Sequence, residues 1–315
     1  MLMSLAHGNL HPMKNIGIVY ALLAYLIWGL APLFWRLIDN VPSGEIVAHR
    51  MLWSAILVLI LIVCMRQWRQ FSLLLKQRKT MFWLFFASIL ISVNWGIYIW
   101  AINNGHIVEA SMGYFINPLF NVLLGVMIFH EKLRINQLMA IAFAVIGVAY
   151  LMFVHGDIPY VALSLAFSFA LYGAMKKSIM VPATHGLAIE TGLVALPALG
   201  YLLYLESAKN LSFGQVSTDD LVLILGGAFT LAPLLLFAAA ARRISMTALG
   251  MTQYLGPSLQ LIIGVFVFNE PFGSERQIAF GFIWFGILLY TIDQLNNRRQ
   301  RRLALNSAGI VVKAE

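Results

Sequence analysis

Apolar runs close to twenty residues long follow one another along this chain, and they restrict its fold more than any other feature. Two of them are MLWSAILVLILIVCM (51–65) and MAIAFAVIGVAYLMFV (139–154). About 20 such residues cross a bilayer as a helix. Of the 315 residues, 61% are hydrophobic and 11% are charged, whereas soluble proteins average about 25% charged residues. The sequence therefore predicts an all-α integral membrane protein.

Breaking the apolar windows at clusters of charged or turn-forming residues predicts ten transmembrane helices. The connections are short and leave no room for a soluble enzyme domain. The N-terminal residues lack a compact apolar stretch behind basic residues, so no cleaved signal peptide is expected. The predicted spans are 16–36, 46–65, 81–102, 108–129, 135–154, 157–175, 186–205, 221–241, 247–268 and 277–294.

Lys and Arg residues orient the predicted spans, because they are retained on the cytoplasmic side. With the N-terminus inside, seventeen of them fall in inner segments and three in outer segments, namely Arg36, Lys209 and Arg276. Both termini are therefore expected in the cytoplasm. The basic stretch RRQRR (298–302) is more typical of a flank that favours anionic lipid than of a nucleic-acid site. The expected partners are the lipid bilayer and a small-molecule substrate, with no nucleic acid.

One stretch of the sequence occurs twice. FINPLFNVLLGVMIFHE (115–131) and YLGPSLQLIIGVFVFNE (254–270) align at an offset of 139 residues. The predicted membrane core (16–293) has 278 residues, which is twice 139. The identical pairs are Pro118 and Pro257, Gly125 and Gly264, Val126 and Val265, Phe129 and Phe268, and Glu131 and Glu270.

A unit of five helices crosses the membrane an odd number of times, so two copies in series must lie upside down relative to each other. Glu131 is then expected at the inner end of its span and Glu270 at the outer end of the matching span. Inverted repeats are a recurring plan of secondary transporters, with the substrate near the bilayer midplane; a duplication kept only for stability is the alternative. The predicted parts are a first repeat (1–154), a second repeat (155–294) and a cytoplasmic basic tail (295–315).

These features resemble a known family. The ten spans, the duplication and the motif NPLFNVLLGVMIFHEKL (117–133) with its partner GPSLQLIIGVFVFNEPF (256–272) are similar to the EamA family of the drug/metabolite transporter superfamily. IVAHRMLWS (46–54), NWGIYIWAINNGHIVEASMGYFINPL (94–119) and MTQYLGPSLQ (251–260) resemble its RarD subgroup, whose members are labelled chloramphenicol-sensitive or chloramphenicol-resistance permeases. The resemblance implies a basket-like ten-helix carrier of the bacterial inner membrane that exports small metabolites or drugs.

Pro118 and Pro257 lie near the middle of their predicted spans and are expected to break the helices. A proline cannot donate to the carbonyl four residues earlier, so Tyr114 and Gln253 each keep a weakened or free backbone acceptor. In hydrocarbon such a group must face protein or a wet cavity. The expected transport pathway therefore follows these two spans; a packing kink satisfied by a neighbouring helix is the alternative.

Polar and aromatic side chains beside these prolines and in the third span are the candidate substrate-binding residues. Amides and aromatic rings offer hydrogen bonds and flat contact without fixed charge. They suit a neutral or zwitterionic solute with an apolar body, such as an aromatic amino acid or an amphenicol. The competing role is helix-to-helix hydrogen bonding. The candidates are Asn94, Trp95, Tyr98, Tyr114, Asn117, Asn121, Gln253, Tyr254 and Gln260.

Ionisable side chains within spans are the second group of candidates, because they are costly in a membrane. Glu45, His49 and Trp53 are spaced by four residues on one helix face, which predicts a Glu–His contact. Arg50 faces elsewhere, and Glu190, its counterpart in the repeat, is the candidate partner. We hypothesise that some of these four groups form a proton-responsive network, since His titrates near neutral pH. Interfacial snorkelling of Glu45 and Arg50 is the alternative.

Other chemistry has little support in the sequence. Cys64 is the single cysteine, which excludes an internal disulfide and a thiolate cluster. No metal-ligand spacing, nucleotide-binding G-x-x-x-x-G-K-[ST] motif or catalytic cluster occurs, so neither a metal, a cofactor nor an enzymatic activity is predicted. A secondary carrier is the favoured function; an uncoupled facilitator or channel and, less so, an integral-membrane enzyme are the alternatives. The solute, the coupling ion and the oligomeric state are not predicted.

Overall fold

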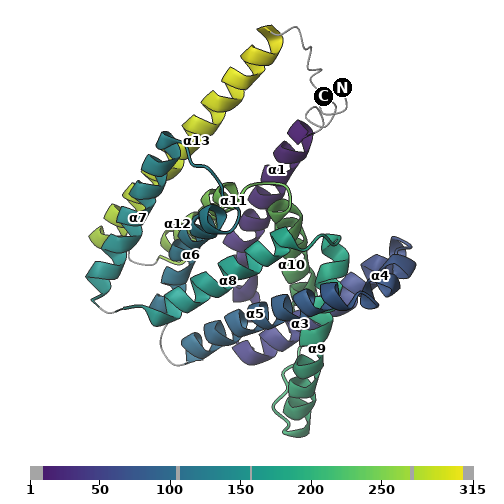
Figure 1. Cartoon of the computed structure of the whole chain (residues 1–315). Coiled ribbons are helices and arrows are strands. Elements are labelled where there is room, and N and C mark those ends of the chain that lie inside the picture. Colours follow the sequence, from purple (N-terminus) through teal and green to yellow (C-terminus); the bar gives the residue numbers. More distant parts are fainter. Residues whose placement is uncertain (1–9, 104–106, 157, 270–272, 308–315) are drawn as a thin grey trace. The chain divides into compact units, whose positions relative to one another are not determined.

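The computed structural model describes residues 10–103, 107–156, 158–269 and 273–307, which form helices joined by short connections (Figure 1). No strand occurs in these ranges. Glu270 and the last eight residues of the predicted tail lie outside them. The α-helices are α1 (Leu10–Gly29), α2 (Ala31–Trp35), α3 (Ser43–Cys64), α4 (Trp68–Leu75), α5 (Arg78–Asn103), α6 (Ile107–Met127), α7 (Ile135–His155), α8 (Tyr160–Ser178), α9 (Ala183–Ser207), α10 (Ser217–Ala241), α11 (Met246–Gln253), α12 (Leu255–Phe266) and α13 (Ser274–Ser307), with a 3-10 turn, η1 (Arg36–Ile38), after α2.

Seven helical segments of the described chain are long and apolar enough to cross a membrane. They lie in α1 with α2, in α3, α5, α7, α9 and α10, and in the first part of α13. The other predicted spans fall on shorter or more polar helices: the apolar part of α6 is Ser111–Met127, α8 ends with Lys176 and Lys177, and the ninth span is divided into α11 and α12. The protein is therefore an all-α, multi-pass membrane protein.

Two predicted spans are interrupted, and each interruption lies just before a proline. α1 ends at Gly29, and α2 has Pro32 in its first turn. α11 ends at Gln253, and α12 has Pro257 in its first turn, which confirms the expected break near Pro257. A proline is tolerated there because its missing N–H would have no partner within the helix. These prolines therefore begin helices.

Pro118 does not break its helix, and that expectation is wrong. α6 continues from Ile107 to Met127, and Pro118 is buried inside it. α11 approaches closely at this point, because a Cβ added to Gly250 would lie 2.5 Å from the carbonyl oxygen of Pro118. Packing against α8 and α11 holds α6 together across the missing hydrogen bond.

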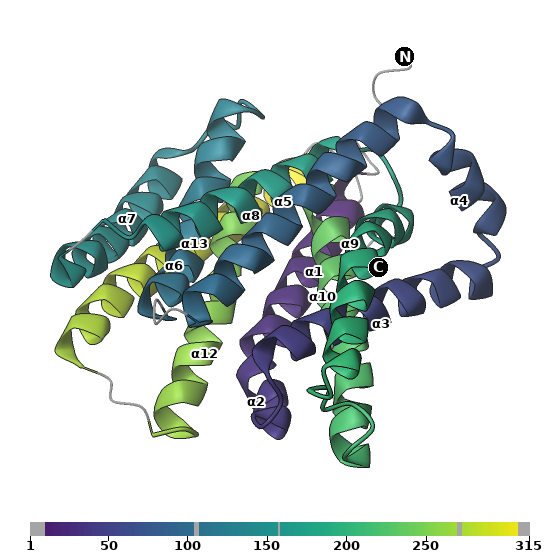
Figure 2. The ribbon, with the colours of Figure 1, turned by 90° about the horizontal axis from the view of Figure 1, so that it is seen from below.

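Two compact units make up the chain, and each takes helices from both halves of the sequence. The larger unit comprises Met1–Phe129 and Pro159–Glu270, and the smaller comprises His130–Ile158 and Pro271–Glu315. Within the larger unit, α3 packs against α9 and α10, α6 packs against α8 and α11, and α1 packs against α10 and α12. Figure 2 shows α1 beside α10. The larger unit contains all the predicted site residues.

The smaller unit is built on the contact between α7 and α13, which lie side by side in Figure 1. Glycines allow the two backbones to approach. A Cβ added to Gly147 would lie 2.6 Å from the carbonyl oxygen of Ala279, and one added to Gly286 would lie 2.5 Å from that of Ala140. Small residues at such contacts are typical of helix pairs in membranes.

Replacing Gly286 by Ala is expected to destabilise the protein, because the added methyl group would press on the backbone of α7. Overpacking of this kind costs about 1–3 kcal/mol. Gly281, on the same helix, has nothing within 4 Å of an added Cβ. Gly281→Ala should therefore be neutral or stabilise by up to about 1 kcal/mol through helix propensity. Thermal unfolding of both variants in detergent measures the difference, and equal midpoints would contradict the close packing of α7 and α13.

Candidate functional site

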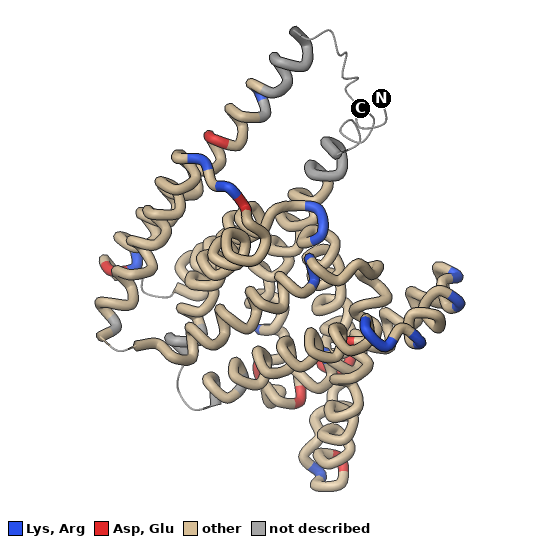
Figure 3. The backbone as a smooth tube through the Cα atoms, in the orientation of Figure 1, with Lys and Arg blue, Asp and Glu red and all other residues tan. Residues whose placement is uncertain are grey.

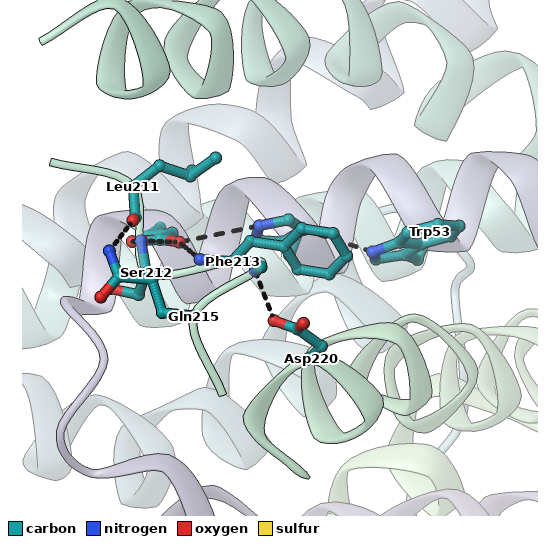
Figure 4. A network of polar contacts seen from close by, with 9 residues as sticks. Trp53, Leu211, Ser212, Phe213, Gln215 and Asp220 are labelled. Carbon is teal, nitrogen blue, oxygen red and sulfur yellow. Dashed lines mark hydrogen bonds and ion pairs between the residues drawn. The ribbon is translucent and has the colours of Figure 1, made fainter. Parts of the chain in front are cut away.

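A buried carboxylate at the start of α3 holds the connection between α9 and α10, where Figure 4 labels Ser212 and Phe213. Glu45 is 0% exposed, and its Oε1 accepts hydrogen bonds from the backbone N–H groups of Ser212 (2.9 Å) and Phe213 (3.0 Å). Its Oε2 lies 3.1 Å from the same Ser212 nitrogen. The carboxylate also lies in the first turn of α3, where a helix N-terminus favours negative charge.

His49 lies one turn further along α3 and extends this network toward Trp53, which is labelled in Figure 4. Its Nε2 is 3.8 Å from Oε1 of Glu45, so the predicted Glu–His contact is confirmed. Its Nδ1 accepts a hydrogen bond of 3.2 Å from the indole nitrogen of Trp53, and its ring stacks on Phe213 with centroids 4.8 Å apart. A neutral imidazole that accepts at Nδ1 carries its proton on Nε2. That proton faces Glu45.

Arg50 is the next residue along α3; it contacts the ring of Trp35 and lines a cavity with Trp95 and Tyr98. Its Nε donates to Oγ1 of Thr230 at 2.9 Å, and its guanidinium carbon lies 4.8 Å from the centre of the Trp35 ring. The ring of Tyr98 makes an edge contact with Tyr114, with centroids 6.2 Å apart. A cavity of about 20 Å³ opens here, a volume sufficient for a water-sized group. It is lined by Val47, Arg50, Met51, Trp95 and Tyr98.

Glu190 is paired within its own half of the chain, so the expected pairing with Arg50 is wrong. Its Oε1 lies 2.7 Å from Nζ of Lys176, and its Oε2 accepts a hydrogen bond of 2.9 Å from the hydroxyl of Tyr172. The connection from α8 to α9 is short, so the last turn of α8 brings Lys176 to the early part of α9. The four ionisable candidates therefore do not meet in one network: Glu45 contacts His49, while Glu190 and Arg50 each have other partners.

A second small cavity, of about 10 Å³, lies beside the Lys176 side chain. Gly186 and Arg242 also line it. Arg242 follows α10 directly and donates a hydrogen bond to the carbonyl oxygen of Val181. Burial, and secondarily the neighbouring charge of Arg243, lower the pKa of the Arg242 guanidinium below its usual value. This end of the larger unit is therefore basic, with Glu190 as the acid that compensates Lys176.

Predicted amide residues meet at the contact between α6 and α11. Nδ2 of Asn121 donates to Oε1 of Gln253 at 2.7 Å and lies 3.2 Å from Oδ1 of Asn117. All three side chains are buried. Oδ1 of Asn121 and the hydroxyl of the buried Tyr254 have no hydrogen-bond partner within the described ranges. The amides thus connect the two helices, and two buried polar atoms beside them have no hydrogen-bond partner among the described residues.

Two further candidates form helix-to-helix hydrogen bonds. Nδ2 of Asn94 donates to the carbonyl oxygen of Leu165 and to Oγ of Ser168, both at 2.9 Å, and so links α5 to α8. Nε2 of Gln260 donates to the carbonyl oxygen of Trp28 at 3.1 Å and links α12 to α1. For these two residues the structure favours the alternative role in helix packing.

Comparison with known proteins identifies the family. The model of the EamA-like transporter family matches residues 15–153. The uncharacterized transporter YojE of Bacillus subtilis (strain 168) is 44% identical over 292 residues, which cover 92% of this chain and 98% of YojE. The chain belongs to the EamA-like transporter family. Protein RarD of Escherichia coli (strain K12) is 39% identical over 285 residues, which cover 90% of this chain and 96% of RarD, so this EamA protein belongs to the RarD-like subgroup.

A solved crystal structure shares the fold of this EamA protein. It superposes with a TM-score of 0.67 over 89% of this chain and 97% of that one, at 17% sequence identity. The family assignment makes the chain a membrane transporter of small solutes. The side chains described above are therefore those of a transporter.

Sequence reasoning missed the aromatic cluster in the larger unit of this EamA protein. Five rings from α1, α8 and α10 pack with centroids 5.3 to 6.3 Å apart. The available signal was the spacing of Tyr25 and Trp28, which places both on one face of α1. Their partners on other helices leave no local pattern in the sequence. The rings are those of Tyr25, Trp28, Phe169, Tyr172 and Phe237.

Proposed function

We propose that this EamA protein is a secondary-active carrier built from two inverted repeats of five helices, which works by alternating access between them. The observation that carries the proposal is that helices at equivalent positions of the two halves pack on one another. When α1 with α2 is the first span and α11 with α12 the ninth, the two halves give five equivalent pairs, and three of these are α3 with α9, α6 with α11, and α7 with α13. Each of these three pairs is in contact.

The most extensive of the other helix contacts occur in matched pairs, which supports the same proposal. The contact of α1 with α10 corresponds to that of α8 with α5, and the contact of α6 with α8 corresponds to that of α12 with α1. The contact of α3 with α10 corresponds to that of α9 with α5. A pseudo-two-fold axis relates contacts in this way. With five helices in each half, that axis lies in the membrane plane.

The ends of the repeated stretches give independent support. α6 ends at Met127 and α12 ends at Phe266, which are 266 − 127 = 139 residues apart. His130 and Asn269, at the same offset, both have a positive φ, of 51° and 55°. Such a φ is uncommon outside glycine. The same backbone turn therefore follows both helices.

The carrier is proposed to lie in the bacterial inner membrane with both termini in the cytoplasm. Lys and Arg are retained on the inner side of membrane proteins, and Figure 3 shows basic residues along α4 and near helix ends. α4 carries Arg69, and its flanks carry Arg66, Lys76, Arg78 and Lys79. This segment is the inner connection after the second span.

Export of small metabolites or drugs is the proposed activity, with an aromatic, neutral or zwitterionic compound or an amphenicol as solute. The aromatic surroundings of Arg50 support a flat solute. Protons are the proposed coupling ion. Glu45 and His49 support this choice, because an imidazole, the side chain that most often carries protons in proteins, lies 3.8 Å from a carboxylate.

Counterflow in liposomes tests the carrier. Vesicles loaded with unlabelled solute are expected to accumulate labelled solute transiently above its outside concentration, because a carrier exchanges solute across the membrane. Protein-free vesicles give the background. Equilibration without overshoot would identify a channel, and chemical change of the label would identify an enzyme; either result would contradict the proposal.

A further inference from the structure

Arg50 carries a positive charge inside the larger unit without an acidic partner in the described structure. Its contacts are the hydroxyl of Thr230 and the face of Trp35, both neutral. The acids predicted to join it in one network have other partners: Glu45 accepts from backbone N–H groups and faces His49, and Glu190 pairs with Lys176. The guanidinium thus keeps donors that no described carboxylate uses.

An unpaired charge in such surroundings costs free energy and marks a functional position. The guanidinium is a planar fork whose parallel N–H groups match the two oxygens of a carboxylate. Arg50, Trp95 and Tyr98 line the same cavity, so a ligand group in this cavity reaches the guanidinium. We propose that Arg50 binds the carboxylate of the transported solute, and that the solute is a small aromatic monocarboxylate rather than an uncharged compound or an amphenicol.

The surroundings of Arg50 restrict the solute further. One guanidinium with only neutral neighbours compensates one negative charge, which favours a monocarboxylate over a phosphate dianion. Trp95 and Tyr98 line the cavity beside Arg50 and supply flat faces for an aromatic body, and Tyr114 contacts the ring of Tyr98. The cavity of about 20 Å³ holds only the charged group, so α3 and α5 must separate to admit the whole solute. This inference rests on the proposed carrier function, which supplies that opening.

Matched ligands that differ only in charge test the recognition. The probes are 3-phenylpropionate and its uncharged amide, 3-phenylpropionamide, titrated against the purified full-length protein in a thermal-shift assay. We expect the carboxylate to bind at least about 10-fold more tightly than the amide. Arg50→Met should abolish this preference, and Arg50→Lys should keep the preference but weaken binding about 10-fold, because the charge remains and the fork is lost. Arg36→Met removes a similar arginine that lies over the Phe268 ring and should leave the preference unchanged.

The thermal midpoint of the ligand-free protein gives a second readout. An arginine kept for binding is unfavourable when empty, so Arg50→Met should raise the midpoint or leave it equal. An arginine kept for packing on Trp35 and Thr230 would show the opposite. Arg50→Met would then lower the thermal midpoint, and the fraction of this variant that still folds would keep its preference for the carboxylate over the amide. That result, or equal binding of carboxylate and amide by the unmodified protein, would overturn the proposal.

The outcomes separate this inference from the carrier proposal. If unmodified protein shows counterflow of the amide or of chloramphenicol, and Arg50→Met shows the same, the carrier stands and the role of Arg50 is wrong. If the carboxylate binds through Arg50 but no loaded vesicle shows overshoot with it, recognition stands and the carrier is wrong. Counterflow of the carboxylate that depends on Arg50 supports both.

Discussion

Glu190→Gln is expected to lower the free energy of unfolding by about 3–5 kcal/mol, the usual cost of leaving one member of a buried ion pair alone. The remaining partner, Lys176, is 5% exposed and has its Nζ 2.7 Å from the Glu190 carboxylate. The substitution also weakens the hydrogen bond from Tyr172, which donates to the second carboxylate oxygen. The buried lysine would then hold a charge without an acid to compensate it.

A double-mutant cycle measures this pair. Lys176→Met should destabilise the protein to a similar degree, while the double variant Lys176→Met with Glu190→Gln should recover part of the loss, because no uncompensated charge remains. Glu206→Gln is the control, since Glu206 is exposed on the same helix and should change stability by less than about 0.5 kcal/mol. Additive losses in the cycle, measured by thermal unfolding in detergent, would show that the two charges do not stabilise each other.

The buried Lys176 and the half-buried Arg50 of the larger unit are thus expected to respond in opposite ways. Lys176 has a carboxylate partner and needs it, whereas Arg50 has neutral partners and is expected to be unfavourable until a ligand arrives. Both stand one residue from another ionisable group in the sequence, and both lie in apolar segments. The local sequence therefore does not distinguish Lys176, which is part of a structural ion pair, from Arg50, which is proposed to bind the solute.

The helices were predictable because membrane crossing requires apolar length. Nine of the ten spans predicted in this way coincide with one helix or with consecutive helices whose ends are shifted by a few residues, as for 46–65 and α3 (Ser43–Cys64). The tenth, 277–294, lies within the longer α13 (Ser274–Ser307). The consequence of a proline was less predictable. Pro257 follows an interruption and Pro118 does not, although the two occupy equivalent positions in the repeat. Packing by neighbouring helices decides whether the helix is interrupted, and the residues around the proline give no information about that packing.

The site was predictable where its contacts are local. Glu45 and His49 are one turn apart on one helix, and their contact follows from helix geometry. The partner of Glu190 was missed because Lys176 was counted among the charges of a cytoplasmic flank, while the structure buries it. The backbone N–H groups that bind Glu45 come from 167 residues away. Such a contact has no sequence signal, because every residue except proline has an N–H group.

Glu45→Ala is expected to destabilise the connection between α9 and α10 and to cost about 3 kcal/mol, since hydrogen bonds to a charged group contribute about 1.5–3 kcal/mol each. The N–H groups of Ser212 and Phe213 would lose their carboxylate acceptor. Glu45→Gln should cost less, because an amide oxygen in the place of Oε1 still accepts from both N–H groups, although without the negative charge. Asp220→Asn is the control: Asp220 accepts from Gly214 in the same connection, but at an exposed position where the contribution is small.

Trypsin provides a local measurement, because Lys209 is an exposed cleavage site in this connection. Cleavage after Lys209 requires the segment to open locally, so its rate should rise most for Glu45→Ala, less for Glu45→Gln and least for Asp220→Asn. The same variants separate a structural from a proton-coupling role. If Glu45 only holds the connection, Glu45→Gln and His49→Ala will leave the pH dependence of transport in proteoliposomes unchanged; if it shares a proton with His49, both variants will flatten that dependence, even where Glu45→Gln resists trypsin. An unaltered cleavage rate in Glu45→Ala would contradict the clamp itself, since the connection would then be held by contacts other than the carboxylate.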